Sequence, residues 1–227
     1  RIRAPFTPAK PAMPSLHPVP APSRSAPPPP HRWVAPALLC AVLGYLLLAA
    51  WLFAPGWERA FRSDHSPAAW LSSALLLALC TTALRLTAER CLPLGLGACL
   101  ALAFAVLAVD EQFMLHELWK FRCHEWTDAC RWAAVREAPM LAVAVVGGAM
   151  LVWLHHALGH RSTRCLLWAG FAVGLAAIAV DQWPALQPHG PWLPALPQWL
   201  ATLEEALEVV AEALVLAALL RQPGTQG

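Results

Sequence analysis

Six apolar segments, each about 20 residues long, constrain this chain more than any other feature. An α-helix rises 1.5 Å per residue, so about 20 apolar residues are enough to cross the ~30 Å hydrocarbon core of a bilayer. The segments therefore predict an all-α, polytopic membrane helix bundle with about six transmembrane helices. These helices are expected at roughly 33–54, 68–88, 91–110, 138–158, 163–183 and 199–220.

The composition agrees with a bundle that lipid surrounds. Hydrophobic residues make up 58% of the chain and charged residues 13%, whereas an average soluble domain has about 25% charged residues. A soluble chain of 227 residues could not cover its surface with so few charges. A nucleic-acid-binding role would need a clustered basic face with interleaved aromatic residues, which the sequence lacks. We therefore expect the lipid bilayer, and no nucleic acid, as a partner.

Two tails flank the apolar part of the chain. Residues 1–32 contain 11 of the 22 prolines, and such a stretch cannot form a packed core. It is predicted to be a disordered, Pro-rich cytoplasmic tail. Residues 33–221 form the predicted six-helix transmembrane domain, and residues 222–227 form a short C-terminal tail.

The distribution of charge predicts which way the bundle faces. With the N-terminus inside, the inner segments hold 10 of the 16 Lys and Arg residues and a single acid, Glu89. Without the first twelve residues the basic count is 7 inside against 6 outside. The predicted orientation then depends mainly on the short loop that contains Arg161 and Arg164. We expect both termini on the cytoplasmic side of a bacterial-type inner (plasma) membrane.

The last apolar segment carries four glutamates. Glu204, Glu208 and Glu212 are spaced by four and share one helical face, and Glu205 lies one residue round. Glu212 would lie about 12 Å along the helix from Glu204. An acid at that depth costs about 2.5–3.5 kcal/mol and normally faces a bundle interior or water. In the alternative interpretation, the helix begins later in the sequence and the glutamates only complement the dipole at its N-terminus. This would explain Glu204 and Glu205 but not Glu212.

A second group of polar side chains lies where the third apolar segment ends. If that helix continued outward, Asp110 and Glu117 would share a face, and His116 would point about 100° away. Carboxylates and an imidazole here could meet the glutamates of the last helix and form an oxygen- and nitrogen-rich set that suits zinc, iron or manganese. The alternative is an acidic, solvated helix end without a ligand. The candidate divalent-metal site comprises Asp110, Glu111, His116, Glu117, Glu204, Glu205, Glu208 and Glu212.

Two of the seven cysteines, Cys123 and Cys130, lie in a polar loop. The predicted orientation places this loop outside, in an oxidising compartment that favours a disulfide. On a straight helix their Cα atoms would be about 10.5 Å apart, too far for a bond. The disulfide therefore requires a turn, which Thr127 and Asp128 would supply. The other five are expected to be small buried hydrophobes: Cys40, Cys80, Cys91, Cys99 and Cys165.

Tryptophan is frequent in the outer loops. Aromatic side chains at this position form the interfacial belt of membrane proteins, where amphipathic rings lie at the level of the lipid headgroups. The residues concerned are Trp119, Trp126, Trp132, Trp183, Trp192 and Trp199.

Three functions fit these observations. The first is a divalent-metal or cation site, with a carboxylate as general base if the protein is an enzyme. The second is a proton- or cation-coupled carrier with Glu208 and Glu212 as the relay, although the helix centres offer few polar residues for a path. The third is a structural or assembly subunit whose acids meet a membrane-protein partner or a second copy of the chain. An assembly subunit would pair its acids with basic residues of another chain. Within this chain the main candidates for such pairing are Arg122, Arg131 and Arg136.

Overall fold

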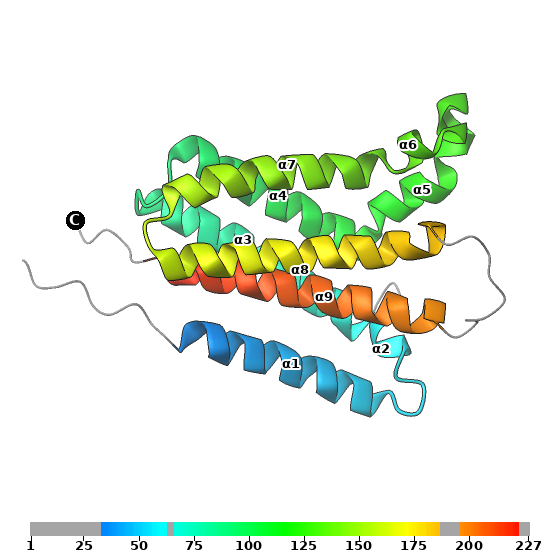
Figure 1. Cartoon of the computed structure of the whole chain (residues 1–227), viewed down its shortest axis with the longest axis horizontal. Helices are drawn as coiled ribbons and strands as arrows, with labels where there is room; N and C mark the ends of the chain where they lie inside the picture. Colours follow the sequence, from blue (N-terminus) through cyan, green and yellow to red (C-terminus); the bar gives the residue numbers. More distant parts are fainter. Residues whose placement is uncertain (1–32, 63–65, 187–195, 223–227) are drawn as a thin grey trace, which may run out of the picture.

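In a computed structural model of the chain, the described residues are 33–62, 66–186 and 196–222. Within these ranges the chain forms helices joined by turns, without a β-strand (Figure 1). The predicted Pro-rich tail and residues 223–227 lie outside the described residues. The long helices are α1 (Val34–Leu52), α3 (Pro67–Ala88), α4 (Leu94–Phe113), α7 (Ala138–Ala157), α8 (Arg161–Leu186) and α9 (Leu196–Leu220). The short ones are α2 (Arg59–Arg62), α5 (Leu115–Trp126), the 3-10 helix η1 (Asp128–Arg131) and α6 (Ala133–Arg136).

Five of the long helices have the length and apolar character needed to cross a membrane. They are α1, α3, α4, α7 and the part of α8 from Arg161 to Val180. The all-α class is confirmed for the described residues. Helix α9 is not among the five because its four glutamates lower its apolar character, although its 25 residues are enough for a crossing.

Local sequence explains where α3 and α4 begin. Ser66 caps α3 by accepting a hydrogen bond from the Ala69 N–H at 3.0 Å, and Pro67 follows in the first helical position. After α3 the chain turns at Arg90, whose φ of 58° is left-handed, and reaches Pro93 before α4 starts. The predicted tight hairpin is present. Helix α4 begins and ends three residues later than predicted.

Helix α9 lies in the middle of the bundle and α7 at its edge (Figure 1). Helix α9 packs against α1, α3 and α8, and its second half is almost fully buried, from Ala211 through Leu219. Helix α7 packs against α4 and α8 and buries only Leu151 and Leu154. The helix that carries the most acids is therefore the most enclosed one.

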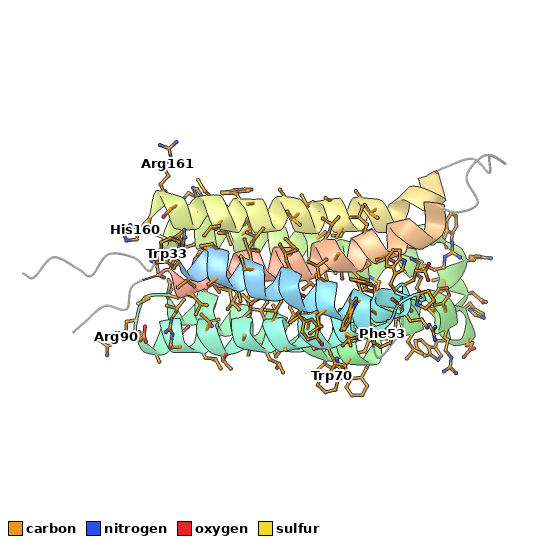
Figure 2. All side chains as sticks on the ribbon, turned by 90° about the horizontal axis from the view of Figure 1, so that it is seen from below. Trp33, Phe53, Trp70, Arg90, His160 and Arg161 are labelled. Carbon is orange, nitrogen blue, oxygen red and sulfur yellow. A yellow bond between two sulfur atoms is a disulfide. The ribbon has the colours of Figure 1, made fainter. Side chains whose placement is uncertain are left out.

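The two ends of the bundle differ in the residues they carry. Helix α1 begins and α9 ends at the same end (Figure 1). Arg90, His160 and Arg161 also lie at this end, which we call the Arg90 end (Figure 2). Helices α2, α5 and α6 lie at the opposite end, which we call the α5 end (Figure 1).

The five cysteines of the apolar segments are not buried, so the prediction for them was wrong. Cys40, Cys99 and Cys165 are exposed, and Cys80 and Cys91 are partly exposed. An almost uniformly apolar helix has no polar face that would turn its cysteines inward. Their small side chains lie on outer helix faces, which is where lipid would contact a membrane bundle.

Gly170 allows α8 to approach α9 closely. A Cβ added at Gly170 would lie 2.8 Å from Val215 Cγ2, 3.0 Å from the Ala211 carbonyl oxygen and 3.2 Å from Leu214 Cβ. The last two atoms cannot rotate away, so any side chain at this position must push the helices apart.

We expect Gly170→Ala to lower the free energy of unfolding by about 1–3 kcal/mol through over-packing. Gly147→Ala is the matched control, because no atom lies within 4 Å of a Cβ added there. This second variant gains helix propensity and should leave stability unchanged or slightly higher. Thermal unfolding of both variants in one detergent, followed by tryptophan fluorescence, compares them; equal midpoints would contradict the close approach of α8 and α9.

Candidate functional site

The chain bends sharply between α4 and α5, so the third helix does not continue straight outward past Phe113. Met114 is left-handed, with φ 49° and ψ 45°, and it separates Phe113, the last residue of α4, from Leu115, the first of α5. The bend turns the start of α5 back toward the last turns of α4. His116 is thereby brought onto Asp110, six residues earlier.

Asp110 holds His116 through two contacts. The His116 backbone N–H donates to Asp110 Oδ1 at 2.9 Å, and His116 Nδ1 lies 2.8 Å from Asp110 Oδ2. The first contact satisfies one of the free N–H groups at the start of α5. The second raises the pKa of His116 above the usual histidine value, and partial burial of the ring opposes this rise. Asp110 therefore fixes both the start of α5 and the orientation of the imidazole.

Ser72 of α3 connects the acids of α4 and α9. Its hydroxyl donates to Glu212 Oε1 at 2.8 Å, across 140 positions of sequence, and it lies near the Glu111 carboxyl group. The other carboxylate oxygen of Glu212, Oε2, is buried and has no hydrogen-bond partner among the described residues. The same holds for Oε2 of Glu205.

A second serine supports the end of α4. Gln112 Nε2 donates to Ser73 Oγ at 2.8 Å, and Ser73 Oγ lies 3.4 Å from the Ala108 carbonyl oxygen, which accepts from it. Sequence reasoning did not assign Ser72, Ser73 or Gln112 to the site. The adjacent serines inside an apolar segment were the available signal, but they were weighed only as isolated polar residues along a transport path.

The eight predicted site residues come together at the α5 end, where they interact electrostatically. Glu205 interacts most strongly with Glu111, Glu204 and Glu117. Glu208 interacts with Glu111, its neighbouring glutamates and His116. Acids of α4, α5 and α9 thus lie within electrostatic range of one another, with His116 as the positively charged group among these interactions when it is protonated. We call these eight residues the acidic cluster: Asp110, Glu111, His116, Glu117, Glu204, Glu205, Glu208 and Glu212.

The arginines that were considered as partners of these acids lie elsewhere. Arg122 pairs with Glu125, with 3.2 Å between Arg122 Nη2 and Glu125 Oε2. Arg131 and Arg136 line a separate pocket on the α5 side. The basic residues of the loop after α5 therefore do not neutralise the acidic cluster.

The donor set of the cluster fits a divalent cation in its chemistry. Carboxylate oxygens and one imidazole are ligands that zinc, iron and manganese accept. The buried, unpartnered Oε2 atoms of Glu205 and Glu212 are oxygens that such an ion would satisfy. With the side chains as they stand, no three His, Cys, Asp or Glu residues of the described ranges are arranged to hold an ion. Binding would therefore require some of these side chains to change rotamer.

Residues 115–136 form a compact unit above the cluster, which we call the α5 unit. A disulfide joins Cys123 to Cys130, both buried, with their Cα atoms 5.8 Å apart. The required turn lies at Thr127, whose Oγ1 accepts from the Ala129 N–H at 3.3 Å and caps η1. Trp119 Nε1 donates to the Val135 carbonyl oxygen at 3.0 Å, which ties α5 to α6.

The described chain is thus a helical bundle with five helices of membrane-spanning character and a set of acids enclosed near one end. Residues 66–222 match the model of a family described as a domain of unknown function, DUF8692, and the chain belongs to that family. The matched part begins at the cap of α3 and ends just after α9, so it contains the whole acidic cluster and leaves out α1. A search of curated proteins and a search of solved structures each found no match.

Asp110→Asn is expected to lower the pKa of His116 toward the ordinary value of about 6.5, because an amide lacks the charge that stabilises the imidazolium. A raised pKa in the folded state contributes stability that is complete below about pH 6.5 and is lost as the pH rises through the folded value. The stability gap between parent and variant should therefore be larger at about pH 6 than at about pH 9. NMR titration of the labelled His116 ring in micelles tests the first statement and thermal unfolding the second. Glu125→Gln is the control, and an unchanged His116 titration in Asp110→Asn would contradict the pairing.

Proposed function

We propose that the chain is a multi-pass membrane protein that binds a divalent cation in the acidic cluster, at the outer end of a bundle with six crossing helices. The observation that carries this proposal is a set of partly buried carboxylates within electrostatic range of one another, in which Oε2 of Glu205 and Oε2 of Glu212 are buried without a hydrogen-bond partner among the described residues. Zinc, iron and manganese are the candidate ions, because the donors are carboxylate oxygens and one imidazole nitrogen.

Electrostatic repulsion explains why a cation would be bound here. Two like charges about 4 Å apart repel by about 4 kcal/mol at an effective dielectric constant of about 20. Each buried oxygen without a hydrogen bond costs about 1–3 kcal/mol in addition. A single divalent ion would offset the charge of two carboxylates and provide a ligand contact for the Oε2 atoms of Glu205 and Glu212.

His116 is oriented as a metal-binding histidine would be. Its Nδ1 contacts Asp110 at 2.8 Å, so Nε2 is the nitrogen available to an ion. Metal-bound histidines commonly have their second nitrogen held by a carboxylate in this way. An ion at Nε2 would displace the Nε2 proton of the imidazolium, whose charge Asp110 stabilises, so we expect weaker binding at low pH.

Six crossings with both termini in the cytoplasm are supported by the position of α9. It is long enough to cross, it lies among helices of membrane-spanning character, and it ends at the Arg90 end, where α1 begins. Arginines in the turns at that end agree with a cytoplasmic side. The disulfide at the α5 end agrees with an oxidising outer side, as in a bacterial-type inner membrane.

The alternatives receive less support from the geometry. A carrier needs a polar path through the bundle, but beyond Glu212 helix α9 is apolar as far as Leu220 and largely buried. An assembly subunit would present its acids to another chain, whereas here the acids of α9 face helices of the same chain. A bound ion fits an enclosed cluster better than either.

Metal content tests the proposal. The full chain, purified in mild detergent without chelators, should carry stoichiometric metal by elemental mass spectrometry, and the Glu205→Gln/Glu208→Gln variant should lose it. The Glu89→Gln/Glu125→Gln variant removes two charges from more exposed acids and should keep the metal. Added ion should also raise the unfolding temperature of the parent but not of the cluster variant.

The cation proposal would be contradicted by a folded parent that carries no metal and whose unfolding temperature does not respond to added zinc, iron or manganese. The same metal content in parent and cluster variant would show that the ion lies elsewhere.

A further inference from the structure

The α5 unit carries a pocket of about 370 Å³ that basic side chains from three elements line. Helix α5 contributes Lys120 and His124, η1 contributes Arg131, and α6 contributes Arg136. The remaining lining residues are Phe121, Thr127, Asp128 and Cys130. Three basic groups and a histidine thus converge on one hollow that contains a single acid.

The two arginines of this pocket are available to a ligand. Arg131 and Arg136 are exposed, and neither forms an ion pair with another described residue. Lys120 is held at 4.0 Å from Glu137 Oε1, which positions its ammonium group at the pocket. Asp128 lowers the positive charge of the lining but does not cancel it.

The backbone that carries these groups is fixed before any ligand binds. The buried Cys123–Cys130 disulfide closes the loop between α5 and η1. The Arg136 N–H donates to the Trp132 carbonyl oxygen at 3.3 Å, so the turn between η1 and α6 is also closed. Arginines held on a fixed backbone lose less conformational freedom when they bind a planar or tetrahedral anion.

The α5 unit that carries the pocket also carries exposed aromatic side chains. Phe121 lines it, and Phe121, Trp126 and Trp132 are 65%, 57% and 65% exposed. Large aromatic rings with this exposure at the end of a membrane bundle lie at the level of lipid headgroups. In a membrane-inserted bundle these rings would place the basic pocket at the depth where phospholipid phosphates are found.

We propose that the pocket of Lys120, Arg131 and Arg136 binds a phosphate group, which an outer-leaflet phospholipid headgroup supplies. Arginine forms paired, charge-assisted hydrogen bonds with phosphate oxygens, and the exposed aromatic rings contact the adjoining glycerol and upper acyl chain. The site uses none of the residues of the acidic cluster. It therefore does not depend on the cation proposal, although it requires that the α5 end lies at a membrane surface.

Binding to the full chain in detergent tests this site by native mass spectrometry. Short-chain phosphatidylglycerol is the lipid probe, inorganic phosphate is the soluble probe, and diacylglycerol is the lipid without phosphate. The parent should bind phosphatidylglycerol but not diacylglycerol. Arg131→Gln/Arg136→Gln should bind it at least about tenfold more weakly, since two charge-assisted contacts are lost. Arg59→Gln/Arg122→Gln removes the same charge from exposed positions outside the pocket and should bind like the parent.

Binding of phosphatidylglycerol without binding of inorganic phosphate supports a lipid headgroup as the ligand. Binding of both, with both lost in the pocket variant, supports a phosphate site that a lipid headgroup can occupy, whereas binding of inorganic phosphate alone contradicts a lipid source and assigns a soluble one. The proposal is overturned if the parent binds neither probe, or if the pocket variant binds as tightly as the parent. Retention of the Cys123–Cys130 disulfide, shown by unreactive thiols at these positions, verifies that the pocket variant is folded.

Discussion

The cost of placing carboxylates in an apolar environment determines where α9 lies. A charged side chain that faced hydrocarbon would be far less stable than one that faces other helices or water. Helix α9 accordingly occupies the centre of the bundle, between α1, α3 and α8. There Glu212 accepts a hydrogen bond from the Ser72 hydroxyl. Helix α7 has no Asp, Glu, Lys or Arg and carries its two histidines, His155 and His156, only in its last turn, so it can remain at the edge with most of its side chains outside the packed core.

The bend at Met114 links this enclosed cluster to the surface unit. Asp110 belongs to the cluster, and through its contacts with His116 it also holds the first turn of α5. The same helix carries Lys120 and His124 of the basic pocket further along. Helix α5 thus contributes side chains both to the acidic cluster, through His116 and Glu117, and to the basic pocket.

Local patterns predicted much of this arrangement. Apolar runs of helical length predicted the six long helices, and the spacing of the glutamates in α9 predicted which of them share a face, because helical periodicity depends only on neighbouring residues. The union of these glutamates with Asp110 and His116 was also expected. The Ser72–Glu212 contact was not, because it joins residues 140 positions apart. The left-handed Met114 had no signal either, since glycine or asparagine usually marks such a bend.

Other features depended on tertiary packing. The exposure of Cys40, Cys99 and Cys165 could not be predicted from helices that are apolar on every face. Arg131 and Arg136 were candidate partners of the acids, but they line a separate pocket that follows the turn at Thr127.

The central claim is that α9, in spite of its glutamates, crosses the membrane in the middle of the bundle. The most direct measurement is the side on which the chain ends, read in a bacterial host from reporters fused after Gly227 or inserted at Asp128. A fluorescent protein after Gly227 should fold and fluoresce in the cytoplasm, and a phosphatase at Asp128 should be active outside. An active phosphatase after Gly227, together with an active one at Asp128, would show that α9 does not cross and would contradict the account.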